Sequence, residues 1–188
     1  MHYFCYLFIP LMLHFCHGAK PKHQYVSYKS SNIKNVNNTI LFCNEPFNGT
    51  LFLLANNGKD TLVSEQFANG LLDGISKKWY PNSQLMEQRT YKLGRKQGIQ
   101  TAFWYNGNKR FEFTAENDAY EGELKEWSED GKLFHVAHYV NGQEAGVQKM
   151  WYTDGTIRAN YVIVKGKRYG LLGTKNCKNV SDSIFSVK

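Results

Sequence analysis

The sequence predicts an all-β fold, an elongated single antiparallel sheet built from about five β-hairpin repeats. Three columns of residues that recur with one period predict it. The first column is glycine, at intervals of 24 residues: Gly74, Gly98, Gly122, Gly146 and Gly170. The second is aromatic, five residues after the first four glycines: Trp79, Phe103, Trp127 and Trp151. The third consists of turn residues nine after the first four glycines, Ser83, Gly107, Gly131 and Gly155, and a further set of turn glycines, such as Gly142, stands four residues before the next first glycine. A fixed period of this length is typical of repeat proteins, in which each unit buries apolar surface against its neighbours.

Residues 146–169 illustrate the unit. Alternation with period two predicts a strand, because successive strand residues point to opposite faces. We expect Asp154-Gly155 to form a two-residue type I′ turn, since both of its central residues need positive φ. Lys165-Gly166 then makes a second turn and returns the chain to Gly170. On the outgoing strand, one face receives Val147, Lys149 and Trp151, and the other receives Gln148, Met150 and Tyr152.

The elements follow in order along the chain. A first hairpin of 25 residues, with one insertion, is followed by four regular units. Short cap strands are expected at residues 40–42 and 171–172, because the end units must cover an open sheet edge. Asp118 replaces the glycine of the second turn in the third unit, which predicts a looser corner there. The five hairpins span residues 49–73, 74–97, 98–121, 122–145 and 146–169.

The glycine column and the aromatic column each have a structural explanation. We expect the first glycine of each unit to lie at a tight corner where a Cβ would crowd neighbouring backbone. The Trp and Phe column should stack along one face as core. The other face should then be exposed and vary between units, with Lys78, Ala102, Glu126 and Met150 on the first strands.

The segment before the repeats differs in composition. Residues 1–18 contain no charged side chain and resemble a secretory signal peptide with cleavage near Gly18 and Ala19. An N-terminal strand or an uncleaved anchor is the alternative. Export predicts a secreted or extracytoplasmic protein. Residues 19–39 are predicted to be a flexible lead-in, residues 40–176 the capped array, and residues 177–188 a C-terminal tail. Glycosylation sequons, relevant in a eukaryotic source, begin at Asn37, Asn48 and Asn179.

Charge and cysteine content limit the possible partners. The net charge of +7 is dispersed along the chain, which argues against a nucleic-acid groove and leaves anionic partners open. Export leaves Cys43 and Cys177. Five hairpins extend roughly 45–50 Å at about 4.8 Å per strand, whereas a disulfide needs Cα atoms within about 7 Å. We therefore expect the two cysteines to stay unpaired or to link two chains.

The pattern Gly-x4-Trp-Tyr-x2-Gly, followed by Tyr-x2-Gly-x3-Gly, resembles the MORN repeat, in the variant found in bacterial proteins assigned as antitoxins of toxin–antitoxin systems. The resemblance covers residues 49–170 and implies a twisted, open sheet that is a scaffold for protein or lipid contacts and has no catalytic residues. Export is at odds with a cytoplasmic antitoxin. The stretches that carry the resemblance are GISKKWYPNSQL, GIQTAFWYNGNK, GELKEWSEDGKL and GVQKMWYTDGTI.

No catalytic, cofactor or metal motif stands out. His135 and His138 are three residues apart, so on a strand they point to opposite faces and cannot share a metal. We therefore expect a non-enzymatic exported scaffold, without a cofactor, that binds a protein partner. The alternatives are an anionic membrane, a glycan, and self-association by sheet edges or Cys linkage. A glycan would bind a ladder of exposed rings on the possible binding face Tyr80, Trp104 and Tyr152.

Overall fold

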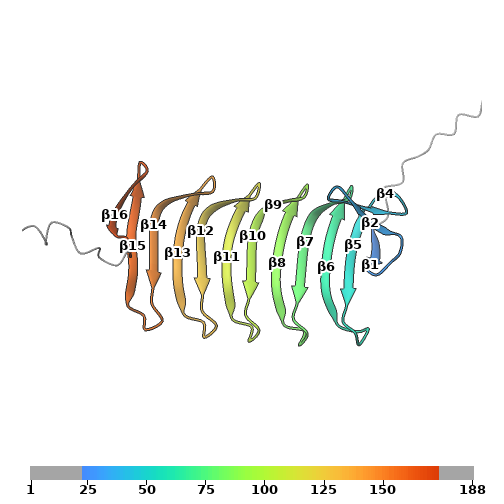
Figure 1. Ribbon diagram of the computed structural model, residues 1–188, viewed down its shortest axis with the longest axis horizontal. Helices are drawn as coiled ribbons and strands as arrows, with labels where there is room; N and C mark the ends of the chain where they lie inside the picture. The colour runs from blue at the N-terminus through green and yellow to red at the C-terminus, as the bar shows by residue number, and fades with distance from the viewer. Residues whose placement is uncertain (1–22, 174–188) are drawn as a thin grey trace, which may run out of the picture.

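The computed structural model describes residues 23–173, which form a long ribbon with the two ends of the array far apart (Figure 1). The proposed signal peptide, Cys177 and the sequon at Asn179 lie outside this range. The described residues contain strands and no helix. The strands are β1 Gln24–Ser27, β2 Ile33–Val36, β3 Thr39–Phe42, β4 Glu45–Pro46, β5 Gly49–Leu54, β6 Thr61–Ala68, β7 Leu71–Trp79, β8 Leu85–Lys92, β9 Arg95–Lys96, β10 Gly98–Phe103, β11 Lys109–Glu116, β12 Ala119–Trp127, β13 Leu133–Val140, β14 Gln143–Trp151, β15 Ile157–Val164 and β16 Lys167–Leu171.

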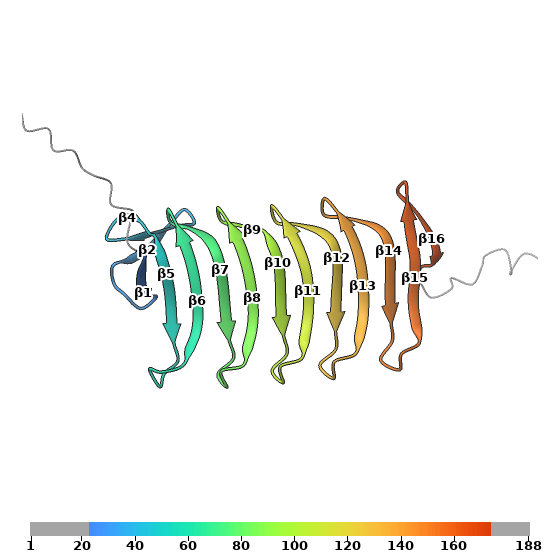
Figure 2. The ribbon, with the colours of Figure 1, turned by 180° about the vertical axis from the view of Figure 1, so that it is seen from behind.

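The repeats form one sheet in which nearly every strand pairs with its neighbours in sequence. The order is β1-β5-β6-β7-β8-β10-β11-β12-β13-β14-β15-β16, and β9 also pairs with β8. Each predicted hairpin is present: β5–β6, β7–β8, β10–β11, β12–β13 and β14–β15. The strands lie side by side across the long axis (Figures 1 and 2). The prediction of an elongated all-β hairpin array is therefore confirmed.

The two edges of the ribbon carry different turns, and the prediction of a type I′ turn at Asp154-Gly155 is wrong. There the Gly155 N–H donates to Tyr152 O and the Tyr152 N–H to Thr156 O. Gly155 has φ +84°, whereas Asp154 is not among the residues with positive φ. This is a type I turn followed by a left-handed glycine, and it creates the bulge in the β14–β15 register. The loops of the second, third and fourth units have the same form, with Ser83 as the left-handed residue in the second. The loop of the first unit is one residue longer, because the Ala55 N–H donates to Asp60 O.

The type I′ geometry lies at the opposite edge, where one hairpin leads to the next. Both residues of Asn141-Gly142 have positive φ, at 51° and 77°. In the third unit the corresponding pair is Asn117 and Asp118, at 50° and 72°. Asp118 therefore keeps the same corner as its counterparts, and the expected looser corner is not present. Asn and Asp are the non-glycine residues that adopt this conformation most readily.

The glycine at the start of each unit is explained by its backbone more than by crowding. Gly122 has φ +70°, and a Cβ there would meet no atom within 4 Å. At Gly170, by contrast, φ is +120° and a Cβ would lie 2.5 Å from the Asn160 carbonyl oxygen. The prediction of backbone crowding is thus correct at Gly170 and wrong at Gly122, where positive φ alone favours glycine.

The sheet has two unlike faces, which we name here. The packed face carries the buried side chains, including Phe113, Ala115 and Ala137. The tryptophan face carries the column Trp79, Phe103, Trp127 and Trp151, which is only half-buried.

The expectation that the tryptophan column is core and that the other face is exposed is therefore wrong. Ala102, expected to be exposed, is 5% exposed on the packed face, and Lys78, Glu126 and Met150 there are half-buried. The packed face is covered where residues just before the first glycine of a unit fold over it, as at Tyr120. The Tyr120 ring centroid lies 4.6 Å from that of Phe113 on the preceding strand.

The N-terminal edge of the sheet is capped by residues that were expected to be flexible. Strand β1 pairs in parallel with β5, and β2, β3 and β4 form a separate small sheet beside it. Phe47, Leu51 and Phe67 are buried there against side chains of both sheets. The lead-in is therefore structured from residue 24, and β3, predicted as a cap strand, belongs to the small sheet. At the other end every residue of β16 is exposed, with Tyr169 at 55% and Leu171 at 53%.

Candidate interaction surface

The tryptophan face presents a row of exposed aliphatic side chains. Ile75, Ile99 and Val147 each follow the first glycine of a unit and are 40%, 59% and 47% exposed. Glu123 occupies the same position in the fourth unit. Two strands separate successive members, or about 9.6 Å at 4.8 Å per strand. Aligned apolar exposure of this kind is typical of a contact surface.

A row of basic side chains runs beside it. Lys77, Lys125 and Lys149 stand two residues further along, with Thr101 in the third unit. Lys125 forms an ion pair with Glu123 at 2.5 Å. In the described residues neither Lys77 nor Lys149 has an ion-pair partner. The surface therefore alternates aliphatic, cationic and aromatic rows from one edge to the other.

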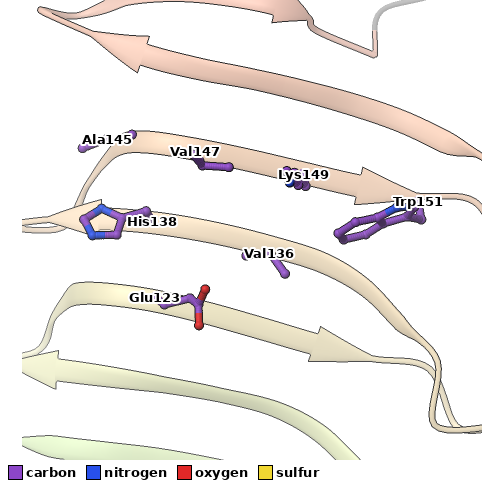
Figure 3. A pocket seen from close by; sticks show the side chains of 8 residues that line it. Glu123, Val136, His138, Ala145, Val147, Lys149 and Trp151 are labelled. Atoms are coloured by element: carbon purple, nitrogen blue, oxygen red, sulfur yellow. The ribbon is translucent and has the colours of Figure 1, made fainter.

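A shallow groove of about 640 Å³ lies on this face between β12 and β14 (Figure 3). Val136 and Val147 lie near its centre, and Lys149 and Trp151 lie toward one end. His138 lies at the other end. The groove is open to solvent, and its lining contains no nucleophile–base pair. It offers apolar contact with charges at its margins.

The predicted ring ladder of Tyr80, Trp104 and Tyr152 is not an open row. Tyr80 and Trp104 are half-buried and Tyr152 is 53% exposed. The Tyr80 hydroxyl donates to Phe103 O at 3.0 Å, and Trp104 Nε1 donates to Trp127 O at 2.9 Å. These two rings therefore attach the second unit to the third and the third unit to the fourth. Sequence reasoning placed all three residues in one column correctly but gave all of them a binding role.

Ionic groups on the packed face are engaged with one another. Lys78 Nζ and Arg89 lie 2.9 and 3.1 Å from the Glu87 carboxylate. Partial burial alone would raise the pKa of Glu87, but hydrogen bonds and charge from Lys78 and Arg89 hold it below its usual value. Arg89 also lies 4.8 Å above the Phe111 ring. This cluster joins three strands, and both of its cations lie against the same carboxylate.

Other titratable groups on this face are also structural. Burial, together with a hydrogen bond to Glu65, raises the pKa of Tyr28 well above its usual value. His135 Nδ1 lies 2.7 Å from Glu126 on the packed face, whereas His138 lies on the tryptophan face. The two histidines therefore point to opposite sides, as their spacing predicted.

Sequence reasoning missed a chain of links between successive type I′ turns. The Gly142 N–H donates to Tyr120 O, and the Glu121 carboxylate accepts from the Asn141 N–H at 2.8 Å. The residue before the first glycine of each unit supplies this acceptor: Asn48, Asp73, Gln97 and Glu121 accept from the amides of residues 69, 93, 117 and 141. The signal was visible in the sequence as a polar column with the period of the repeat.

The last unit lacks both links. Ala145 stands where the other units have a polar acceptor, and within residues 23–173 no bond joins the Gly166 N–H to Glu144 O. A gap of about 510 Å³ lies between the last two turns, bordered by Ala145 and Gly166. The final hairpin is therefore attached less firmly at this edge.

Residues 23–173 contain neither a cluster of metal-ligating side chains nor a helix that could span a membrane. That range contains no group of three or more His, Cys, Asp or Glu side chains placed to hold a metal ion. Over the same range no helix is long and apolar enough to cross a membrane. Cys43 is exposed and forms no disulfide with a described residue.

Comparison with known proteins gives one family signal. The model of the MORN repeat variant matches residues 72–93 and 120–141. No curated protein matches the chain. Two solved structures show a distant likeness, each with a TM-score of 0.33 and 13% identity. One is a mutant of S. aureus TarM in complex with fondaparinux, α-GlcNAc-glycerol and UDP, and the other is TarM.

The TarM likeness covers 65% and 58% of this chain, and in each case 21% of the TarM chain. A TM-score of this size carries no argument about function. The MORN match is more informative, because repeats of this kind are generally interaction modules. The two matched stretches have the same hairpin and corner geometry as the unmatched ones. The model of the MORN repeat variant thus matches two of the five structurally similar hairpins of the array.

Proposed function

We propose that the protein is a non-catalytic scaffold that binds a protein partner through the tryptophan face. The observation that carries the proposal is the exposed aliphatic row Ile75, Ile99 and Val147, which recurs at one position of three units. Aliphatic side chains on a broad, nearly flat surface suit contact with another protein surface, where apolar area lies inside a polar rim. The lysine row beside it would favour a partner with acidic side chains.

The two alternatives have less support. A glycan ladder needs rings that lie open to solvent, and Tyr80 and Trp104 are half-buried with their polar atoms bonded to the next unit. An anionic membrane would use the basic pairs at two corners of the array, Arg95-Lys96 and Lys167-Arg168. Arg168, in one of those pairs, lies 2.9 Å from Glu144 and is partly neutralised. Export, with a signal peptide at residues 1–18, remains part of the proposal.

The test compares two double variants of the full-length protein. Ile99→Ser with Val147→Ser removes apolar area from the tryptophan face. Leu93→Asn with Val164→Ser removes exposed apolar area at the turn edge and is the matched control. Each is immobilised, and proteins captured from the native compartment are quantified by mass spectrometry. We expect one captured protein to fall at least tenfold with the first variant and to be unchanged with the second.

A photo-crosslinker at Ile99 should label the same protein in the wild-type background. Capture that is equal for both variants, or a crosslink that labels nothing above a control at Glu116, would contradict the proposal. Sedimentation with vesicles of 30% anionic lipid tests the membrane alternative directly. Binding to these vesicles that is lost at high salt, without a captured protein, would replace the proposed function.

A further inference from the structure

The hairpin loops of the last four units begin with one row of residues: Tyr80, Trp104, Ser128 and Tyr152. Tyr80 and Trp104 each extend a ring over the next unit and donate a hydrogen bond to its backbone, at Phe103 O and Trp127 O. The next member of the row is Ser128. Its hydroxyl donates within its own turn, to Asp130 and, at 3.0 Å, to Lys132 O. It is too short to cross to the following unit as the rings do.

A groove occupies the position where that ring would lie. Its volume is about 970 Å³, and Trp104 and Tyr152, the neighbours of Ser128 in the row, lie on its walls. Leu133 and Phe134, each 37% exposed, contribute more apolar surface. The groove therefore lies beside the one member of the row that has no ring.

We propose that this groove binds an aromatic side chain that carries a hydrogen-bond donor, the indole of Trp or the phenol of Tyr, from the protein partner. The inference rests on the proposed function and names the chemistry of one contact. The array itself provides the template, because a phenol at position 80 and an indole at position 104 fill the equivalent space. In both, a polar atom at the ring edge donates to the backbone of the next unit, and Trp151 O is the equivalent acceptor here.

The charges at the margin fit the same occupant. Arg158 lies 5.9 Å above the Tyr152 ring, and Lys132 lies 2.9 Å from Asp130. Glu129 completes a margin of mixed sign. A neutral ring with a peptide backbone on either side meets such a margin without an unpaired buried charge. The groove is larger than one ring, so residues flanking the aromatic side chain also have room.

The first experiment uses three blocked amino acids as probes of the full-length protein: N-acetyl-tryptophan amide, N-acetyl-tyrosine amide and N-acetyl-phenylalanine amide. Binding is followed by NMR shifts of the Trp151 and Trp104 indole protons. We expect saturable binding of the Trp and Tyr probes with Kd roughly in the millimolar range. The Phe probe lacks the donor and should bind about threefold to tenfold more weakly.

Variants then locate the site. Ser128→Trp restores the ring that the repeat lacks, so it should abolish binding of the Trp probe and raise Tm by a few degrees. Ser128→Ala removes the hydroxyl but leaves the groove open, and is the matched control that keeps binding. If Ser128→Trp fails to fold, Tyr152→Ala removes one wall, and binding should fall at least fivefold.

Capture of the partner separates this inference from the proposed function. Loss of the partner with Ser128→Trp, but not with Ser128→Ala, supports both. Retained capture with Ser128→Trp, when Ile99→Ser with Val147→Ser abolishes it, overturns the inference and leaves the proposed function standing. Absence of saturable probe binding to the wild type also overturns it, including the case in which another segment of this chain or a second copy fills the groove. Equal affinity for all three probes would show that the hydrogen-bond donor of the ring does not contribute to binding, and would contradict the proposal.

Discussion

Replacing Ala145 by Glu should restore a link that the last unit lacks. In the unit before it, the Glu121 carboxylate accepts a hydrogen bond from the Asn141 N–H at 2.8 Å. Residue 145 occupies the equivalent position, and the Lys165 N–H is the equivalent donor, 20 residues later in the sequence. We expect Ala145→Glu to form the missing bond and to bring the final turn closer to the turn before it.

The magnitude follows from the kind of bond. A hydrogen bond to a charged group contributes about 1.5–3 kcal/mol where water is excluded, and exposure at this edge reduces the expected gain to about 1 kcal/mol. For a chain of this size that corresponds to a Tm increase of roughly 2–4 °C. Because repeat arrays can open locally, the sharper measurement is amide exchange, in which protection of the Lys165 amide should rise about fivefold.

The reverse change tests the same reasoning in a neighbouring unit. Glu121→Ala should lower protection of the Asn141 amide by a similar factor, because it removes an acceptor that is present. Unchanged exchange of both amides would refute the view that this polar column links the turns. A gain with Ala145→Glu that persists at pH 2, where the carboxylate is protonated, would show that the effect is not due to the carboxylate.

Three further predictions concern stability. Burial would raise the pKa of Glu87, but Lys78 and Arg89 hold it below its usual value of 4.5 in the folded state. The stability that the Glu87 carboxylate contributes is therefore present above about pH 4.5 and is lost as the pH falls further. In Glu87→Gln, the free energy of unfolding measured with urea should depend less steeply on pH over that range. Trp104→Phe keeps a ring but loses the donor to Trp127 O, and calorimetry should show a loss of about 1 kcal/mol; an unchanged Tm would mean that this bond does not hold the units together. In Gly122→Ala the added Cβ has no atom within 4 Å, but a residue with a side chain must adopt φ +70°. Chemical denaturation should therefore show a loss of roughly 1 kcal/mol in the free energy of unfolding. A stabilised protein would contradict the assignment of positive φ.

The hairpin array could be predicted from the sequence because its determinants are local and periodic. Turn residues and strand alternation recur every 24 residues, and each unit contacts mainly its neighbours in sequence. What could not be predicted is which face is packed. Period two separates Ala102 from Phe103 but does not say that residues just before a first glycine, such as Tyr120, pack over the Ala102 side. That depends on a bend at the first glycine of each unit, which alternation alone does not reveal.

The turn types show a second limit of the sequence. Asp154-Gly155 and Asn141-Gly142 are similar dipeptides, yet one belongs to a type I turn with a left-handed glycine and the other to a type I′ turn. The number of residues in each loop decides between them, and strand ends are difficult to place from sequence. The candidate surface was also predicted only in part. The column containing Tyr152 was recognised, but the groove beside Ser128 in that column became evident only from the structure.

Each hairpin lies next to those that flank it in sequence, so the length of the array is set by the number of units. Inserting or deleting one complete 24-residue unit would change the distance between its two ends by about 9.6 Å while both end structures stay the same. Homologues that differ by whole units would therefore hold whatever they bind at separations that change in steps. Duplication of a single unit could therefore change the distance between the two ends of such a protein without any change of fold.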